Sequence, residues 1–281
     1  MKKIADDILN KVISSRPIIS YKGSFGRVIT IGGNEEYGGA IIMATNAAVH
    51  AGAGLVTCAT SKINVTALHA QLPEAMFIDY TDTTKLNQAI TKSNVVVIGP
   101  GLGTTAQSLA ILKTTIAALS ANHFIIVDGS AITLLAKNRN LLSQLKIANV
   151  IFTPHEMEWQ RLSGIPIPNQ DIKSNQSKQE SLSANVVLKK YHTEIYHTNG
   201  SISQLSIGGP YMSTGGMGDT LTGIIAAFLC QFKQVSTSDR IDAAVYIHSA
   251  VASSLATQKY VVLPSDIIAE LQHYMLISQK K

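Results

Sequence analysis

The sequence predicts an α/β fold in which a mostly parallel central sheet lies between helices on both of its faces. Two observations lead to this prediction. Short β-branched runs without charged residues recur along the chain, and continuous apolar runs are typical of strands buried on both faces. Segments long enough for helices separate most of these runs, and such alternation is typical of a parallel sheet.

Each expected strand is a short run of apolar and β-branched residues. The expected strands are residues 28–31, 55–59, 95–98, 124–127, 150–152 and 185–188. Two of the connecting segments, residues 38–51 and 105–119, repeat apolar residues at intervals that suit one face of a helix. These segments are therefore predicted to be helices that cover the sheet.

The last third of the chain departs from this alternation. Residues 185–207 contain three short strand candidates with turns at residues 190–192 and 198–200, which indicates a hairpin added to the sheet. Polar residues 165–179 are expected to form an exposed loop that leads into a helix. Helices are expected over residues 218–232, 238–257 and 264–277. Because the chain shows neither an internal repeat nor a linker, we predict a single domain over residues 1–281.

Composition and charge narrow the classes of function. The chain is 46% hydrophobic and 15% charged, which excludes a disordered, charge-extended protein. Its formal net charge is +5, but the basic residues are scattered and no stripe of them is interleaved with aromatic residues. We therefore expect no nucleic-acid partner, whereas a mild positive charge favours an anionic small molecule.

The cysteines and the apolar segments indicate the cellular compartment of the protein. Cys58 and Cys230 lie in apolar runs without metal-ligand spacing, so both are expected to be buried core thiols. The longest apolar run, around residues 224–230, is too short to span a bilayer. Acidic residues near the N-terminus interrupt any signal-peptide pattern. We expect a cytoplasmic protein without a membrane segment.

Ligands of open parallel sheets bind at the carboxyl ends of the strands, and two glycine-rich loops are expected there. Residues 32–40 open a helix with glycines, but the lysine and hydroxyl of a P-loop are missing. Either a plain turn or an anion-binding helix start fits this loop. In residues 99–105 three alternating glycines favour close ligand approach over a simple proline turn. Neither loop matches the dinucleotide fingerprint.

Acidic residues and a histidine follow two further strands. Asp128 comes directly after the predicted strand 124–127 and could serve either as a helix cap or in function. His155 and Glu158 follow the strand that ends at residue 152, and their spacing places them on one face of a helix. We favour a functional role for this pair over a helix cap with solvated acids.

The strongest signal is a glycine-rich turn that runs into an apolar helix. Gly215, Gly216, Met217 and Gly218 precede Asp219 in this turn. Free N–H groups of the turn and the helix dipole point to one place, which makes an anion hole. The glycines leave space in front of Asp219, so its carboxylate suits a general base beside a transferring phosphoryl group.

This turn resembles the anion-hole motif of the ribokinase-like superfamily, in which the aspartate is the base that acts on the acceptor hydroxyl. Other segments of this chain occur in the same order as in one family of that superfamily. These segments are residues 38–40, 51–57, 99–103, 153–155 and 214–219. Over about residues 20–260 the chain resembles the ADP-dependent NAD(P)H-hydrate dehydratases. The resemblance implies a three-layer ribokinase-like fold and a nicotinamide-nucleotide repair enzyme.

The resemblance also implies site residues. The positions matching those that bind the hydrated dinucleotide are Ala40, Gly103, His155 and Asp219. The stretch matching the adenine-nucleotide segment is Lys189, Lys190, Tyr191, His192 and Thr193, and Gly218 matches the turn at the phosphates. Superfamily members usually carry a metal-linked acid three residues after an asparagine. His155 stands in place of that asparagine, which makes Glu158 the candidate for organising Mg²⁺ through water.

The implied reaction returns hydrated NADH or NADPH, the (6S)-NADHX and NADPHX forms, to the reduced dinucleotide. ADP, or ATP, would be the co-substrate. The resemblance further implies a homo-oligomer, a tetramer, and an NAD(P)HX epimerase on a separate protein. One alternative is a ribokinase-like kinase of a small hydroxylated vitamin or sugar precursor. The other is a non-catalytic dinucleotide-binding protein or an NAD-dependent oxidoreductase, against which the missing fingerprint argues.

Overall fold

The computed structural model describes residues 1–279, and within them all strands join one ten-stranded sheet. Its order is β1-β10-β9-β8-β7-β6-β5-β2-β3-β4. The strands are β1 (Lys2–Ile4), β2 (Arg27–Ile31), β3 (Leu55–Thr60), β4 (Met76–Asp79), β5 (Val95–Ile98), β6 (Phe124–Val127), β7 (Asn149–Phe152), β8 (Asn185–Leu188), β9 (Glu194–Tyr196) and β10 (Ile202–Leu205). Every pairing is parallel except the two that involve β9.

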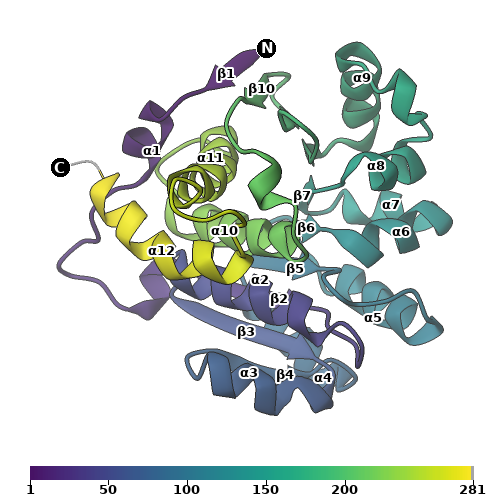
Figure 1. Ribbon diagram of the computed structural model, residues 1–281. Helices are drawn as coiled ribbons and strands as arrows, with labels where there is room; N and C mark the ends of the chain where they lie inside the picture. Colours follow the sequence, from purple (N-terminus) through teal and green to yellow (C-terminus); the bar gives the residue numbers. More distant parts are fainter. Residues whose placement is uncertain (280–281) are drawn as a thin grey trace.

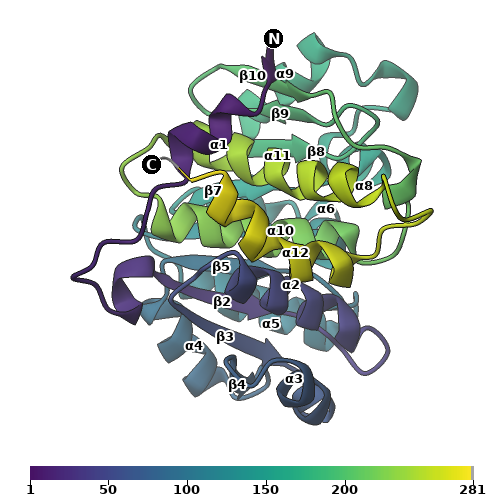
Figure 2. The same ribbon diagram turned by 60° about the vertical axis from the view of Figure 1, so that its left-hand side comes forward.

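Helices cover both faces of this sheet (Figures 1 and 2). One face packs against α1 (Asp7–Val12), α2 (Gly38–His50), α10 (Met217–Gln231), α11 (Thr237–Leu255) and α12 (Pro264–Ile277). The other face packs against α4 (Thr83–Lys92), α5 (Ala106–Ala117), α6 (Gly129–Lys137), α7 (Asn140–Leu145) and α8 (Glu156–Ser163). The remaining helices are α3 (Val65–Gln71) and α9 (Ile172–Leu182). The predicted mostly parallel sheet between two helical layers is confirmed.

Side chains of the central strands explain why both faces are covered. Along β5, Val95 and Val97 belong to the core under α10, whereas Val96 and Ile98 belong to the core under α5. All four side chains are fully buried. A strand that is apolar at every position has no face to offer to water, so it needs a helical layer on each side.

The structure departs from the sequence-based expectations in two places. The edge strands β1 and β4 were not predicted, because their short and partly polar sequences lack a continuous apolar run. Residues 165–179 are not simply an exposed loop, since Asn175 and Gln179 on α9 are buried. The Asn175 side chain accepts a hydrogen bond from Trp159 Nε1 at 2.7 Å, and Gln179 Nε2 donates to the Ala184 carbonyl at 2.6 Å. The single domain over residues 1–281 stays a prediction, since residues 280–281 lie outside the described part.

The parallel strands bring the candidate loops together. Residues 32–40, 99–105, 128–130, 153–158 and 189–193 follow β2, β5, β6, β7 and β8, which are neighbours in the sheet. Their carboxyl ends therefore meet at one edge, where α10 also begins. None of the helices within residues 1–279 combines the length and the apolar character that a bilayer-crossing segment needs.

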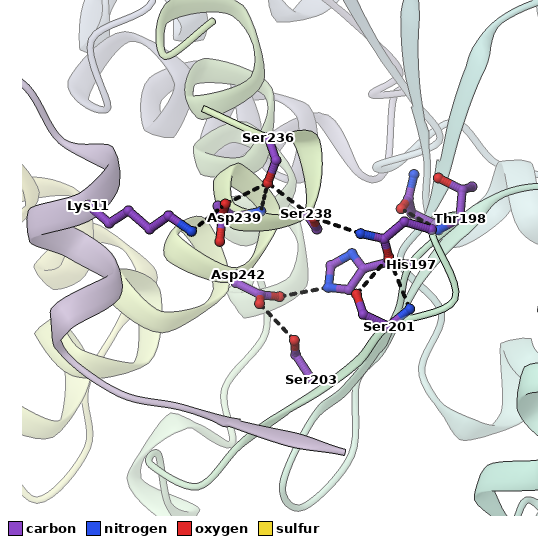
Figure 3. A network of polar contacts seen from close by, with 11 residues as sticks. Lys11, His197, Thr198, Ser201, Ser203, Ser236, Ser238, Asp239 and Asp242 are labelled. Atoms are coloured by element: carbon purple, nitrogen blue, oxygen red, sulfur yellow. Dashed lines mark hydrogen bonds and ion pairs between the residues drawn. The ribbon is translucent and has the colours of Figure 1, made fainter. Parts of the chain in front are cut away.

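A buried polar network fastens the β9–β10 hairpin to α11 (Figure 3). His197 Nε2 lies 2.9 Å from Asp242 Oδ1, and Ser203 Oγ donates to Asp242 Oδ2 at 2.7 Å. Serine, histidine and aspartate are the residue types of a hydrolase triad. Here, however, both contacts end on the aspartate, so the histidine cannot activate the serine. The network is structural.

We expect Asp242→Ala to lower the free energy of unfolding by about 3 kcal/mol, because His197 and Ser203 would lose their acceptor inside the core. Denaturant unfolding followed by circular dichroism measures this change. Glu74→Ala, a carboxylate removed from an exposed position, is the control and should change stability by less than about 0.5 kcal/mol. Equal effects of the two substitutions would show that the network does not hold the hairpin.

Candidate active site

Helix α10 begins at a turn that only glycine can form without strain. Gly216 occupies the N-cap with a φ of 95° and offers no side chain to cap the helix. A Cβ at this position would also meet the Met43 side chain of α2 at 2.4 Å. The first N–H groups of α10 therefore remain without a hydrogen-bond acceptor. Asp219 lies in the first helical turn beside them.

A lysine and an aspartate from two strand ends meet in front of this helix. Lys189, just after β8, places its Nζ 2.7 Å from Asp128 Oδ1. Thr153 Oγ1, just after β7, donates to the same carboxylate oxygen at 2.8 Å. A Cβ on Gly218 would lie only 2.9 Å from Lys189 Nζ, so the glycine leaves room for the ammonium group at the helix start.

The sequence left the role of Asp128 open between a helix cap and function. The residue occupies the N-cap of α6, but its side chain makes no cap hydrogen bond. It is 3% exposed, and its carboxylate instead holds the ammonium group of Lys189. The geometry therefore favours the functional interpretation.

Asp219 is electrostatically unusual. Burial, with the negative charge of Asp128, raises the pKa of Asp219 to about 6, although the positive charge of Lys189 opposes the shift. No hydrogen bond contributes to this pKa, and its carboxylate has no donor among the described residues. A carboxylate with a pKa near neutrality and free lone pairs is suited to accept a proton.

His155 and Glu158 form the cap of α8. His155 Nδ1 accepts the N–H groups of Met157 and Glu158, at 3.2 and 3.3 Å, and Glu158 Oε2 accepts the N–H of His155 at 2.9 Å. Because Nδ1 accepts, the neutral ring carries its proton on Nε2. Burial raises the pKa of Glu158 despite the opposing charge of Lys189. The pair therefore does form a helix cap. The interpretation that its acids are solvated is wrong for Glu158, which is buried.

A cavity of about 690 Å³ opens between the β8–β9 turn and α10. All of residues 189–193 line it, as do Gly218, Met217 and His155. Lys190 Nζ is 2.8 Å from Glu194 Oε1, which braces the turn, and the exposed ring of Tyr191 stacks on His192 with 4.0 Å between centroids. The cavity has the size of a small-molecule site.

Ala40 and Gly103 lie apart from this cavity, in the loops after β2 and β5. The Gly103 N–H donates to Ser130 Oγ at 3.1 Å, and a Cβ on Gly103 would come within 2.9 Å of Asn34 Nδ2. The Ala40 N–H lies 3.3 Å from the Tyr37 carbonyl at the start of α2. The structure thus divides the candidate residues into a group around the cavity and a group at the neighbouring strand ends.

Sequence reasoning gave no role to three residues of this region. Thr153 and Ser130 follow strands, which is the signal that could have found them. His248, which lines the cavity from α11, lies mid-helix and gave no signal at all.

The charges of the site fit a cation brought by a ligand. Within residues 1–279, no group of three or more histidine, cysteine or acidic side chains is arranged to hold a metal ion. Mg²⁺, however, is usually bound by one or two carboxylates together with substrate phosphates and water. Three acids and one ammonium group lie close enough to affect one another's charge: Asp128, Glu158, Asp219 and Lys189. The site therefore carries more negative than positive side chains.

Comparison with known proteins now decides the family. The family model described as NAD(P)H-hydrate dehydratase matches residues 28–273. The chain belongs to the NAD(P)H-hydrate dehydratase family. A relative from Enterococcus faecalis, named ADP-dependent (S)-NAD(P)H-hydrate dehydratase, is 47% identical over 98% of this chain and 93% of its own length.

Solved structures agree with this assignment to the dehydratase family. A ribokinase-like superfamily protein from Enterococcus faecalis is 45% identical, with a TM-score of 0.94 over 100% of this chain and 97% of that one. The ADP/ATP-dependent NAD(P)H-hydrate dehydratase of Bacillus subtilis, co-crystallised with ATP and Mg²⁺, is 21% identical with a TM-score of 0.84 over 99% and 98% of the two chains. The ribokinase-like fold predicted from the sequence is confirmed.

The raised pKa of Asp219 can be measured directly. We expect its carboxyl carbon to titrate with a midpoint near pH 6 in an NMR titration, assigned by its loss in Asp219→Asn. Asp128→Asn should lower the midpoint, because the substitution removes a neighbouring negative charge. A midpoint at the ordinary value of 3.8 would contradict the burial and crowding of this carboxylate.

Proposed function

We propose that this dehydratase-family chain converts (6S)-NADHX and NADPHX back to NADH and NADPH, with ADP as co-substrate and AMP and phosphate as products. The family assignment and the names of relatives such as the 47% identical protein of Enterococcus faecalis support the reaction. The observation that carries the chemistry is Asp219, a proton acceptor at the free N–H groups of α10.

The reaction needs a better leaving group than hydroxide. In the proposed first step, the C6 hydroxyl of the hydrated ring attacks the β-phosphorus of ADP, and Asp219 accepts the hydroxyl proton. A new O–P bond forms while the bond to AMP breaks. The ring nitrogen then expels phosphate from C6, and loss of a proton from the adjacent carbon restores the dihydropyridine.

Several groups are placed to stabilise the charge that moves in this transfer. The N–H groups of residues 215–218 and the Lys189 ammonium, which adjoins the start of α10, would stabilise the charge on the transferring phosphoryl group. Glu158 would hold Mg²⁺ through water, with the nucleotide phosphates as its other ligands, and the ion would neutralise the diphosphate.

We further assign the candidate residues to the two substrates as the family resemblance implies, so that His155 goes with the dinucleotide although it lines the cavity. Residues 189–193 and Gly218 would bind the adenine nucleotide, in the cavity that they line. Ala40, Gly103, His155 and Asp219 would bind the hydrated dinucleotide. His155 would contribute the N–H of its Nε2, which also lies 3.5 Å from Glu158 Oε1, because its Nδ1 accepts the cap hydrogen bonds.

We propose that the protein acts in the cytoplasm as a homo-oligomer, a tetramer, alongside a separate NAD(P)HX epimerase. The family resemblance supports this assembly and setting. Large apolar side chains stand exposed near both ends of the chain and support self-association: Ile18, Ile19, Leu276 and Ile277.

Incubation of the purified protein with hydrated NADH, Mg²⁺ and ADP tests the reaction. We expect the absorbance of the reduced nicotinamide to recover and AMP and phosphate to appear in equal amounts. Mass spectrometry distinguishes the rival kinase reaction, because a kinase would accumulate a stable phosphorylated product. No recovery with either ADP or ATP would overturn the proposal.

We expect Asp219→Asn to lower turnover at least about 100-fold while ADP still binds, because a general base typically contributes 10²- to 10⁴-fold. Steady-state kinetics and calorimetric ADP binding measure the two effects. Asp7→Asn, on the exposed surface of α1, is the matched control and should leave turnover unchanged. A loss of less than about tenfold in Asp219→Asn would remove this residue from the proton-transfer role.

A further inference from the structure

The two consecutive lysines after β8 are each held by a buried carboxylate. The acidic side chains are 4% and 6% exposed in the pairs Lys189–Asp128 and Lys190–Glu194. In the other lysine–carboxylate pairs of the described residues the acid is between 16% and 35% exposed. Lys189 belongs to the phosphate site, but Glu194 has no part in the proposed reaction. Because a buried ion pair adds little to stability on balance, the value of this pair lies in the position that it gives to Lys190.

Glu194 is itself held by a chain of hydrogen bonds from the core. Its Oε1 lies 2.8 Å from Lys190 Nζ, and its Oε2 accepts the hydroxyl of Tyr196 at 2.6 Å. The Tyr196 oxygen accepts from Asn175 Nδ2 at 3.2 Å, and Asn175 Oδ1 accepts from Trp159 Nε1 at 2.7 Å. The last three side chains are fully buried. The carboxylate is therefore a fixed point to which the Lys190 side chain is attached.

The turn between β8 and β9 needs such an attachment. His192 has a φ of 57°, in the left-handed region that residues other than glycine occupy at an energetic cost. Strained backbone of this kind persists only where the surrounding contacts fix it. The pair of Lys190 and Glu194 spans His192. Since residues 189–193 all line the cavity of about 690 Å³, the ion pair fixes one wall of that cavity.

We propose that Glu194 is a positioning residue. By holding Lys190, it keeps residues 190–193 in the conformation that binds the adenine nucleotide. The proposal rests on the proposed function, because it needs a nucleotide in this cavity. It deepens that function by naming a residue outside the cavity lining on which nucleotide binding depends.

The two lysines act on opposite faces of the sheet. Lys189 turns to the start of α10, which packs in one core. Lys190 turns to Glu194, whose partner Tyr196 lies in the core of the other face. Glu194 is also absent from the acids that raise the pKa of Asp219. Loss of Glu194 should therefore change nucleotide binding and leave the proton transfer intact.

Charge alone predicts the opposite effect on binding. Glu194 neutralises the ammonium group of Lys190, so removal of the carboxylate leaves one more positive charge beside the cavity. That charge attracts a diphosphate more strongly, whereas a loosened turn binds it more weakly. The sign of the change in ADP affinity therefore distinguishes a positioning role from a purely electrostatic one.

Glu194→Gln tests the proposal, because glutamine keeps the volume and an acceptor for Tyr196 but loses the charge that holds Lys190. Calorimetry with ADP should give about three- to tenfold weaker binding than to the parent. The loss should persist from about 0.15 M to about 1 M salt, where charge effects are screened. The KM for ADP should rise by a similar factor while kcat stays within about twofold. Glu180→Gln, exposed on α9, is the matched control and should bind ADP like the parent.

A double-mutant cycle shows whether Glu194 acts through Lys190. Lys190→Met should weaken ADP binding by a similar factor, and the double variant should bind within about twofold of Lys190→Met. Losses that multiply would show two independent effects and overturn the proposal. Where Glu194→Gln does not fold, Lys190→Met carries the test, since an unchanged ADP affinity of this variant is equally decisive against the proposal. Lys173→Met, exposed on α9, is its matched control.

The outcomes separate this inference from the proposed reaction. If the parent binds ADP and repairs the hydrate, but folded Glu194→Gln binds ADP equally well or more tightly, only the positioning role is overturned. A lower melting temperature with unchanged ADP affinity leads to the same conclusion, because it reveals a purely structural residue. If the parent binds no adenine nucleotide, both the inference and the proposed function fail. Weaker binding at both salt concentrations, not deepened in the double variant, supports the proposal.

Discussion

The ammonium group of Lys189 lies 2.7 Å from Asp128 Oδ1, at the point where α10 begins. A helix N-terminus carries partial positive charge, so a lysine is an unfavourable neighbour for it unless acids balance the charge. Burial alone would lower the pKa of Lys189, but Asp128 and Glu158 raise it and keep the group charged. The ion pair thereby concentrates positive charge and free N–H groups in one place, which is what a diphosphate requires.

The parallel sheet makes this ion pair possible. Asp128, Thr153 and Lys189 follow the neighbouring strands β6, β7 and β8. The pairing continues beyond the strand ends, because the Lys189 N–H donates to the Pro154 carbonyl at 2.8 Å. Residues that are 61 positions apart in the chain are thus held in register by backbone hydrogen bonds. A ligand of this site would therefore meet the charged side chains at the strand ends without any rearrangement of the sheet.

The sequence predicts the layers and the loops better than the contacts between them. Continuous apolar strands such as β5 and glycine-rich turns such as residues 215–218 are local patterns, so both could be predicted. The partner of Asp128 is a residue from another strand end, and no local pattern encodes that pairing. His248 lies within an apolar helix, where a histidine is indistinguishable from a core residue until the cavity beside it is known.

The site contains three carboxylates, and their partners decide which of them can act as the base. Asp128 is engaged by Lys189 and Thr153, which both contact its Oδ1, so this carboxylate already has its partners. Glu158 accepts the N–H of His155 and closes the cap of α8. The Asp219 carboxylate accepts no such hydrogen bond. Its pKa of about 6 reflects burial and repulsion by the neighbouring carboxylates. A proton taken up by Asp219 therefore relieves an unfavourable charge, whereas the carboxylates of Asp128 and Glu158 are already occupied by Lys189, Thr153 and the cap of α8.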